Sequence, residues 1–146
     1  MIPTELSAEK VNLIYKKIKP YINHTPVINA TDSLNKYFST NLFFKCEFLQ
    51  KSGSFKARGA INNIISQDKN KIKNGITAVS AGNHAIASSF VANIFNLRNK
   101  IFLYESANKF RIQTCKNYGA NIFFTNPKQA FIAVSYTHLR AHETRT

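Results

Sequence analysis

Lys56 is the side chain whose surroundings suggest chemistry most directly. It lies in the run K-S-G-S-F-K-A-R-G-A at 51–60, beside Phe55 and between two glycines. The apolar residues that follow predict a helix whose first turn carries Lys56, where the helix dipole disfavours a lysine by about 0.3–1 kcal/mol. A lysine amine that becomes partly neutral is a nucleophile for carbonyl groups and can form a Schiff base. Taken alone, however, the run favours an ordinary solvated lysine.

A second candidate is the segment S-A-G-N-H at 80–84, which follows a short predicted strand and precedes a predicted helix. The start of such a helix presents free backbone N–H groups and the positive end of the dipole, which together bind a carboxylate or a phosphate. Gly82 lets a ligand approach the backbone because it has no side chain. By itself this segment is most simply an ordinary turn, with Asn83 near the start of the helix.

A third candidate lies near the C-terminus, where His138 and His142 are four residues apart and Glu143 follows. That spacing suggests a helical metal pair, but the order matches neither H-E-x-x-H nor its inverse. Residues 134–146 also break the pattern of the preceding chain and resemble the translation of a common transposase sequencing adapter. We therefore predict no metal site, and we interpret 134–146 as a non-native tail on a chain that breaks off near residue 133.

The elements that must position Lys56 and the 80–84 segment alternate along the chain. Apolar spacing and capping residues predict helices from Ser7 to Pro20, from Thr31 or Asp32 through Phe38, from Lys56 through Ile65, from about Asn83 to Leu97, and up to Tyr118, where Gly119 follows. Strands are predicted at 42–49, which should be mostly buried, at 76–81, at 101–104 and at 121–125. Strands that alternate with helices imply βαβ units, a parallel sheet with flanking helices, and the α/β class.

A net charge of +13 over 146 residues is the most unusual feature of the composition, and it suggests a nucleic-acid partner. The lysines are scattered, however, and the sequence has no Arg-rich block and no recognition-helix signature. A generally basic, solvated surface is therefore the favoured interpretation, and we expect no nucleic-acid partner.

The cysteines and the N-terminal residues indicate the cellular compartment in which the protein would be found. Cys46 and Cys115 are far apart, match no metal-ligand spacing and follow no secretion signal, which predicts a reducing compartment. The start MIPTELSAEK lacks a basic region followed by an apolar one, and no apolar run approaches the roughly 20 residues that span a bilayer. We therefore expect a cytoplasmic protein without a membrane partner.

Together the first two candidate segments are far more specific than either alone. The run K-C-E-F-L-Q-K-S-G-S-F-K-A-R-G-A, followed about twenty residues later by S-A-G-N-H-A, resembles the pyridoxal-phosphate enzymes of the serine/threonine dehydratase family, and the similarity extends from residue 25 to about 122. The resemblance implies an N-terminal fragment of the two-domain fold type II, which is similar to the tryptophan synthase β subunit. Residues 1–70 would belong to the large domain, and 71–133 would form most of the small one.

The resemblance also implies roles for individual residues. The lysine that carries the cofactor, pyridoxal phosphate, as a Schiff base is Lys56 here, and Phe55 would lie beside the cofactor. Asn83 would donate a hydrogen bond to the phenolic oxygen of the cofactor. The substrate carboxylate would be bound by the turn that consists of Ser80, Ala81, Gly82, Asn83 and His84. The family's glycine-rich phosphate loop and its partner for the pyridine nitrogen would lie further along the chain, so we expect the fragment itself to be inactive.

The implied reaction is the β-elimination of ammonia from L-threonine or L-serine, by an enzyme that is a homo-oligomer when complete. The sequence departs from the family at Ile86-Ala87, where Gln-Gly is usual, and at Leu103-Tyr104, where Met-Pro is usual, which leaves the choice between threonine and serine open. Alternatives are a serine racemase or another lyase of β-hydroxy amino acids, a cysteine-synthase-like enzyme, whose turn would read T-S-G-N-T-G, and a non-catalytic basic binding module. Ala81 replaces the serine of related racemases and favours elimination.

Overall fold

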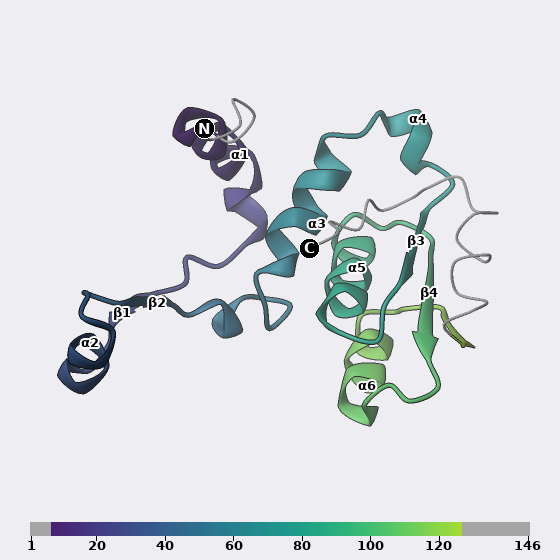
Figure 1. Cartoon of the computed structure of the whole chain (residues 1–146). Helices are drawn as coiled ribbons and strands as arrows, with labels where there is room; N and C mark the ends of the chain where they lie inside the picture. The colour runs from purple at the N-terminus through teal and green to yellow at the C-terminus, as the bar shows by residue number, and fades with distance from the viewer. Residues whose placement is uncertain (1–6, 127–146) are drawn as a thin grey trace.

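Helices and strands alternate along the computed structural model, which describes residues 7–126 (Figure 1). In chain order the elements are α1 (Ala8–Ile18), η2 (Lys19–Tyr21), β1 (Val27–Asn29), α2 (Asp32–Phe38), β2 (Phe43–Lys45), η3 (Glu47–Leu49), α3 (Lys56–Ile65), α4 (Lys69–Ile72), β3 (Ile76–Val79), α5 (Asn83–Ile94), β4 (Asn99–Tyr104), α6 (Lys109–Asn117) and β5 (Ile122–Thr125). Strands β1 and β2 form an antiparallel pair, while β3, β4 and β5 form a parallel sheet with β4 in the centre.

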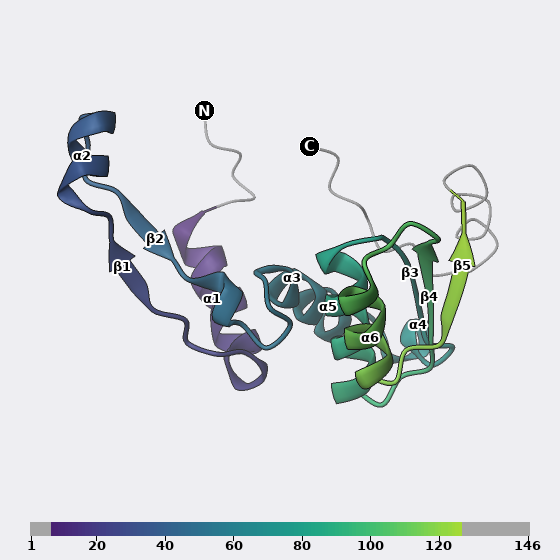
Figure 2. The same ribbon diagram turned by 90° about the horizontal axis from the view of Figure 1, so that it is seen from below.

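The parallel sheet confirms the α/β prediction. Helix α5 connects β3 to β4 and helix α6 connects β4 to β5, and Figure 2 shows both helices on the same side of the sheet. The central strand carries Ile101 and Leu103, both fully buried, and Ile101 lies opposite Ala78 of β3 and Ile122 of β5. Side chains from the sheet and from α5 and α6 therefore form one apolar cluster.

Helix α5 is buried along most of its length, because every residue from 85 to 92 has little exposure. Its polar Ser89 is accommodated by donating its hydroxyl proton to the carbonyl oxygen of Ala85 at 2.8 Å. The helix ends at Ile94, three residues before the predicted Leu97, because Asn96 adopts the left-handed conformation with φ of 51°.

Helix α3 packs on α5 through one apolar stripe. Ala57, Ile61 and Ile64 have the helical spacing of a buried face, and they share a cluster with Phe90 and Val91 of α5. This cluster contains residues from both sides of position 70, where the sequence analysis divided the chain into two domains. That division stays a prediction.

The segment 42–49 differs from the buried strand predicted for it. Only Phe43–Lys45 form a strand, all three residues are exposed, and the chain then turns into η3. Strand β2 pairs only with β1 within residues 7–126, and no further layer of this described part covers either face of the two-stranded sheet. Apolar residues therefore identified a strand but not its burial. The short elements β1 and α4 were not predicted.

Two glycines with positive φ mark turns between elements. Gly119 follows the end of α6 with φ of 71°, as predicted. Gly75, between α4 and β3, has φ of 97°, and a Cβ atom there would clash with the carbonyl oxygen of Arg98. The close approach of these two backbone segments aligns the starts of β3 and β4, since the Ile76 N–H donates to the same Arg98 carbonyl at 2.8 Å.

Within residues 7–126, no helix is both long and apolar enough to cross a membrane. The same range holds no group of three His, Cys, Asp or Glu side chains that could bind a metal ion, and His138, His142 and Glu143 lie outside it. Cys46 and Cys115 are free and buried. Burial raises the pKa of the Cys115 thiol, which makes this side chain a poor nucleophile.

Candidate active site

Lys56 is the first residue of α3, as predicted, and it is half-buried. The next residue, Ala57, is fully buried in the α3–α5 cluster, so the backbone that carries Lys56 is anchored in the core. The Lys56 Nζ atom lies 5.3 Å from the centroid of the Phe55 ring. The Phe55 ring is 59% exposed, so it lies beside the lysine side chain without shielding it from solvent.

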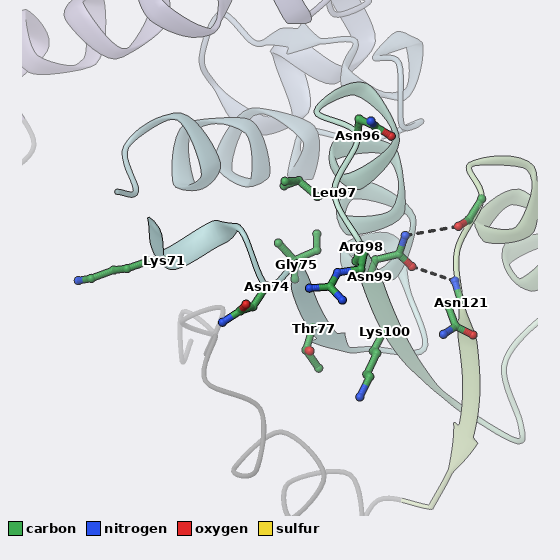
Figure 3. A pocket seen from close by; sticks show the side chains of 12 residues that line it. Lys71, Asn74, Gly75, Thr77, Asn96, Leu97, Arg98, Asn99, Lys100 and Asn121 are labelled. Atoms are coloured by element: carbon green, nitrogen blue, oxygen red, sulfur yellow. Dashed lines mark hydrogen bonds between the residues drawn. The ribbon is translucent and has the colours of Figure 1, made fainter. Parts of the chain in front are cut away.

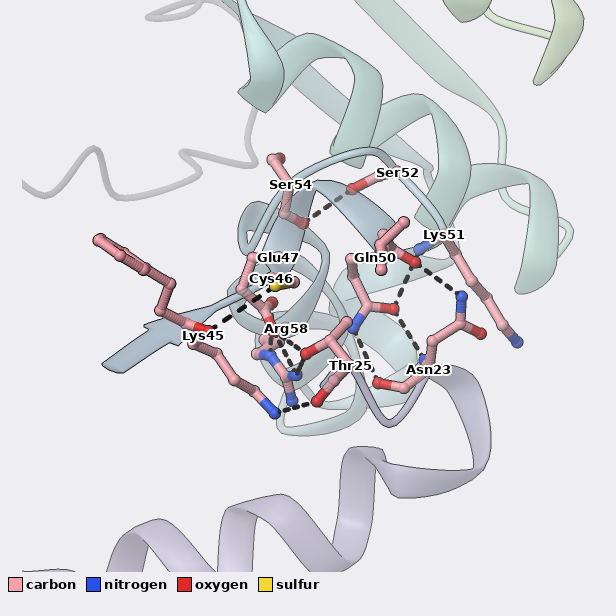
Figure 4. A network of polar contacts seen from close by, with 12 residues as sticks. Asn23, Thr25, Lys45, Cys46, Glu47, Gln50, Lys51, Ser52, Ser54 and Arg58 are labelled. Atoms are coloured by element: carbon pink, nitrogen blue, oxygen red, sulfur yellow. Dashed lines mark hydrogen bonds and ion pairs between the residues drawn. The ribbon is translucent and has the colours of Figure 1, made fainter. Parts of the chain in front are cut away.

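The loop before Lys56 is tied down by the buried side chain of Gln50 (Figure 4). Its Oε1 accepts hydrogen bonds from the N–H groups of Asn23 at 2.8 Å and Lys51 at 3.0 Å, and its Nε2 donates to the Asn23 carbonyl at 3.0 Å. The Gly53 N–H in turn donates to the Gln50 carbonyl at 2.7 Å. The turn that leads into α3 is therefore held by a network of hydrogen bonds.

An ion pair joins the first turn of α3 to the segment after β2. The Arg58 guanidinium donates from Nε to Glu47 Oε2 at 2.8 Å and from its Nη2 to Oε1 at 2.7 Å, a bidentate arrangement. The buried Thr25 hydroxyl donates to the same carboxylate at 2.6 Å. The hydrogen bonds from Arg58 lower the pKa of the Glu47 carboxyl to about 2, although partial burial opposes this change. The pair thus links residue 25, residue 47 and the helix of Lys56.

The segment Ser80–His84 forms the predicted turn between β3 and α5, and two of its five amides are already engaged. The Ser80 N–H donates to the Phe102 carbonyl at 3.1 Å, and the Gly82 N–H donates to Ser80 Oγ at 3.1 Å. The Arg111 guanidinium donates to the Ala81 carbonyl at 3.4 Å. These amides therefore have partners within the protein, and the role of the turn in binding a carboxylate stays a prediction.

Gly82 precedes α5, and the space above it is open. A Cβ atom at Gly82 would meet nothing closer than Ser80 Oγ at 3.9 Å. Asn83 is the first residue of α5 and is exposed, and α5 has no side-chain cap. A ligand can therefore approach this helix start.

Figure 1 shows α3 and α5 side by side, with the first turns of both toward the lower end of the view. Lys56 and Asn83 are the first residues of these two helices. The packing of α3 on α5 thus brings the two predicted site segments, which lie about twenty-five residues apart in the sequence, to the same end of the helix pair.

A hollow among the described residues lies elsewhere. Figure 3 shows it at the amino ends of β3 and β4, around Gly75 and Asn99. Its volume is about 670 Å³. Asn99 bridges to the start of β5, because its Oδ1 accepts from the Asn121 N–H at 2.8 Å and its Nδ2 donates to the Gly119 carbonyl at 3.4 Å. Ser80 follows the opposite, carboxyl end of β3, so this hollow is separate from the candidate site.

The sequence analysis missed the polar residues that support the site. Glu47, Gln50 and Arg58 all lie in the run that identified Lys56, but no role was given to them. The opposite charges of Glu47 and Arg58 were a signal, yet a separation of eleven residues across a loop does not reveal contact. A buried glutamine could not be distinguished from an exposed one without the fold.

The comparisons with known proteins bear on the family and the fold. A sequence model of the family described as pyridoxal-phosphate dependent enzymes matches residues 18–144. Its last residues fall outside the described part of the chain, where the interpretation of 134–146 as a non-native tail stays a prediction.

Three curated relatives carry different names. A phenylserine dehydratase of Ralstonia pickettii is 38% identical over 62% of this chain and 28% of its own length. A serine racemase of Arabidopsis thaliana is 40% identical over 76% of this chain and 33% of its own length. An L-threonine ammonia-lyase of Geobacter sulfurreducens is 37% identical over 56% of this chain and 20% of its own length. The chain thus spans about a third or less of these relatives.

Among solved structures, that of maize serine racemase superposes with a TM-score of 0.78 and 31% identity, over 89% of this chain and 40% of that one. The parallel sheet with its helices and this structural likeness place the chain in the class of fold type II enzymes. The chain belongs to the pyridoxal-phosphate dependent enzyme family.

The residues of this chain fit the cofactor of that family, pyridoxal phosphate. The aldehyde of the cofactor requires a primary amine, which Lys56 offers at the start of α3. The exposed Asn83 amide offers a hydrogen-bond donor at the start of α5. Ser54, two residues before Lys56, has a buried hydroxyl oxygen without a hydrogen-bond partner in the described part of the chain.

Proposed function

We propose that the complete enzyme to which this segment belongs catalyses the deamination of L-threonine and/or L-serine by β-elimination, giving 2-oxobutanoate or pyruvate plus ammonia. The observation that carries this proposal is the placement of Lys56 and the Ser80–His84 turn at one end of the packed α3–α5 pair. An amine and an anion-binding helix start are the two groups that an amino-acid substrate of such an enzyme requires. The names of a dehydratase and an ammonia-lyase among the relatives support the same reaction class.

Lys56 would hold the cofactor through its amine, and this amine, once free, would take the proton from the substrate Cα atom. When bound, the cofactor would supply a pyridinium ring that stabilises the negative charge on Cα. Asn83 would orient the cofactor by donating a hydrogen bond, and the start of α5 would bind the substrate carboxylate. The β-hydroxyl would leave as water, and hydrolysis of the released enamine would give the oxo acid and ammonia.

Serine racemisation is the competing function, because racemases are among the relatives. Racemisation requires a second acid–base group on the face of the substrate opposite Lys56. Ala81 precedes Gly82 in the turn, and its methyl group cannot carry a proton. The Ser80 hydroxyl accepts a hydrogen bond from the Gly82 N–H, so it is engaged within the turn itself. These features favour elimination over racemisation.

The first experiment measures oxo-acid formation from L-threonine by the full-length enzyme with added pyridoxal phosphate. Lys56→Ala should abolish turnover, because the proposal assigns both the binding of the cofactor and the removal of the Cα proton to the Lys56 amine. Asn83→Ala should lose about ten- to a hundredfold, since it removes one hydrogen bond of about 1–3 kcal/mol. Activity of Lys56→Ala within tenfold of the wild type would remove Lys56 from this role.

The second experiment separates elimination from racemisation. We expect recovered serine to remain in the L form after partial conversion, and we expect Ala81→Ser to increase the D isomer. Chiral chromatography of the remaining serine measures both. Accumulation of D-serine at a rate comparable to that of pyruvate by the wild type would instead favour a racemase.

A further inference from the structure

Two serines flank Gly53 in the loop before Lys56, and they differ in one respect. Ser52 and Ser54 are both buried, with exposed fractions of 5% and 6%. Ser52 Oγ donates to the Ser54 carbonyl at 3.3 Å. Ser54 Oγ, in contrast, is the one buried side-chain oxygen or nitrogen that lacks a hydrogen-bond partner within residues 7–126. The structure therefore holds a donor that it does not use.

The loop around Ser54 is held in place, so the position of its hydroxyl is fixed. The Gly53 N–H donates to the Gln50 carbonyl at 2.7 Å, and the Tyr118 hydroxyl donates to the Lys51 carbonyl at 2.7 Å. In Figure 4 the side chain of Ser54 points away from the network around Glu47 and from Ser52. Its hydroxyl therefore faces a different part of the molecule from the groups that stabilise the loop.

An unsatisfied buried hydroxyl destabilises a folded protein, because folding removes its hydrogen bond to water. Such groups are rare in native structures, and each exception calls for a specific explanation. Ser54 lies two residues before Lys56, at the start of the ten-residue helix α3, whose N-cap residue Phe55 provides no side-chain cap. The helix dipole and the hydroxyl thus both favour an oxygen ligand at this helix start.

We propose that Ser54 is a cofactor-contacting residue, which donates its hydroxyl proton to an oxygen atom of pyridoxal phosphate. This role rests on the proposed function of Lys56, since the lysine brings the cofactor to the start of α3. The orphaned hydroxyl is costly in the apo enzyme and becomes satisfied when the cofactor binds. The Ser54 hydroxyl therefore destabilises the apo enzyme and increases its affinity for the cofactor.

The test compares Ser54→Ala with the matched control Ser52→Ala in the full-length enzyme. Thermal unfolding of the apo form and titration of the Schiff-base absorbance with pyridoxal phosphate are measured for both. Ser54→Ala should leave the apo melting temperature unchanged or raised and weaken cofactor binding about five- to a hundredfold. Ser52→Ala, which removes a satisfied hydrogen bond, should lower the apo melting temperature and change cofactor affinity less than threefold.

Two additions make the result decisive. Ser54→Cys keeps the size of the side chain with a weaker donor, so its affinity should fall between those of serine and alanine. Titration with pyridoxal, which lacks the phosphate, locates the acceptor. A loss of affinity seen only with the phosphorylated form assigns the contact to a phosphate oxygen. A loss of affinity with both forms assigns it to the phenolic oxygen.

The proposal is overturned if Ser54→Ala lowers the apo melting temperature without changing cofactor affinity, since the hydroxyl would then bond to another part of the chain. Loss of folding in both Ser54 variants would lead to the same conclusion. A Lys56→Ala variant distinguishes the two proposals. If it abolishes the Schiff-base absorbance while Ser54→Ala binds normally, only the role of Ser54 is wrong.

Discussion

The arm, formed by β1, α2 and β2 (residues 27–45), and the helix pair α3–α5 both carry many apolar side chains, but most of the large ones are buried in the helix pair and exposed in the arm. In the arm, Val27 and Phe43 are 57% and 64% exposed, and α2 has no buried residue. In the helix pair, Ile61 and Val91 are 0% and 1% exposed. Figure 1 shows the arm projecting away from the helices and the parallel sheet.

This difference explains where the candidate site lies. Lys56 is on the buried helix pair, which fixes its backbone. The loop that precedes Lys56 follows the arm and η3 along the chain. The Glu47–Arg58 pair connects α3 to the segment that directly follows the arm, and Gln50 connects the loop before α3 to Asn23, which precedes the arm. The position of Lys56 thus depends on the core for rigidity and on a few polar contacts for its relation to the arm.

The largest expected difference between the regions concerns stability. Ile61→Ala should cost about 2–5 kcal/mol because it leaves a cavity in the α3–α5 cluster. Phe43→Ala should change the free energy of unfolding by less than about 0.5 kcal/mol, as expected of an exposed side chain. Urea unfolding of the apo full-length enzyme measures both. A comparable loss of unfolding free energy in Phe43→Ala would show that the complete enzyme buries the arm. That result would contradict the difference between the arm and the helix pair.

A smaller effect is expected where the two regions meet, and it depends on pH. The pKa of the Glu47 carboxyl is about 2 in the folded protein, below its ordinary value of 4.5. The unfolded chain therefore binds the proton first as the pH falls, so the stabilisation is complete above about pH 4.5 and is lost between about pH 4.5 and 2. Because the pair is partly exposed, we expect about 1–2 kcal/mol from it.

Glu47→Gln should remove this pH-dependent stabilisation, whereas Glu105→Gln, at an exposed position after β4, should retain it. Urea midpoints measured between pH 3 and pH 7 provide the comparison. Parallel curves for the wild type and Glu47→Gln would show that the ion pair does not connect the arm to α3 in solution.

The smallest effects concern two helix caps, one in the arm and one on α6, which packs on the parallel sheet. Asn108 caps α6 by accepting from the Phe110 N–H at 2.8 Å, and Thr31 caps α2 by accepting from the Leu34 N–H at 3.4 Å. Asn108→Ala should cost about 1 kcal/mol of global stability, because α6 packs on the sheet. Thr31→Ala should cost a few tenths and instead increase hydrogen exchange in α2 alone. Equal global losses would mean that both regions unfold together.

Much of the fold was predictable from local patterns. The start of α3 at Lys56, the βαβ order and the stop at Gly119 follow from apolar spacing and from glycine, which are local properties. The burial of 42–49 was predicted incorrectly, because a run of apolar residues reports a strand but not whether another layer covers it. The end of α5 was misplaced because the left-handed Asn96 has no unambiguous sequence signal.

The sequence motifs predict Lys56 and Asn83 as site residues, and these roles stay a prediction. The structure adds that both are the first residues of packed helices, which the motifs did not indicate. The difference between Ser52 and Ser54 has no sequence signal, since two buried serines in one loop differ only in which atoms lie within reach. Contacts of this kind depend on the folded geometry.

The most direct test of the account asks which lysine holds the cofactor. The full-length enzyme, saturated with pyridoxal phosphate, is reduced with sodium borohydride, digested and analysed by mass spectrometry. We predict that the phosphopyridoxyl group is found on Lys56, with no modification of the neighbouring Lys51 or of Lys45 in the arm. A modification on either of those residues, with Lys56 unmodified, would contradict the assignment of the site to the start of α3.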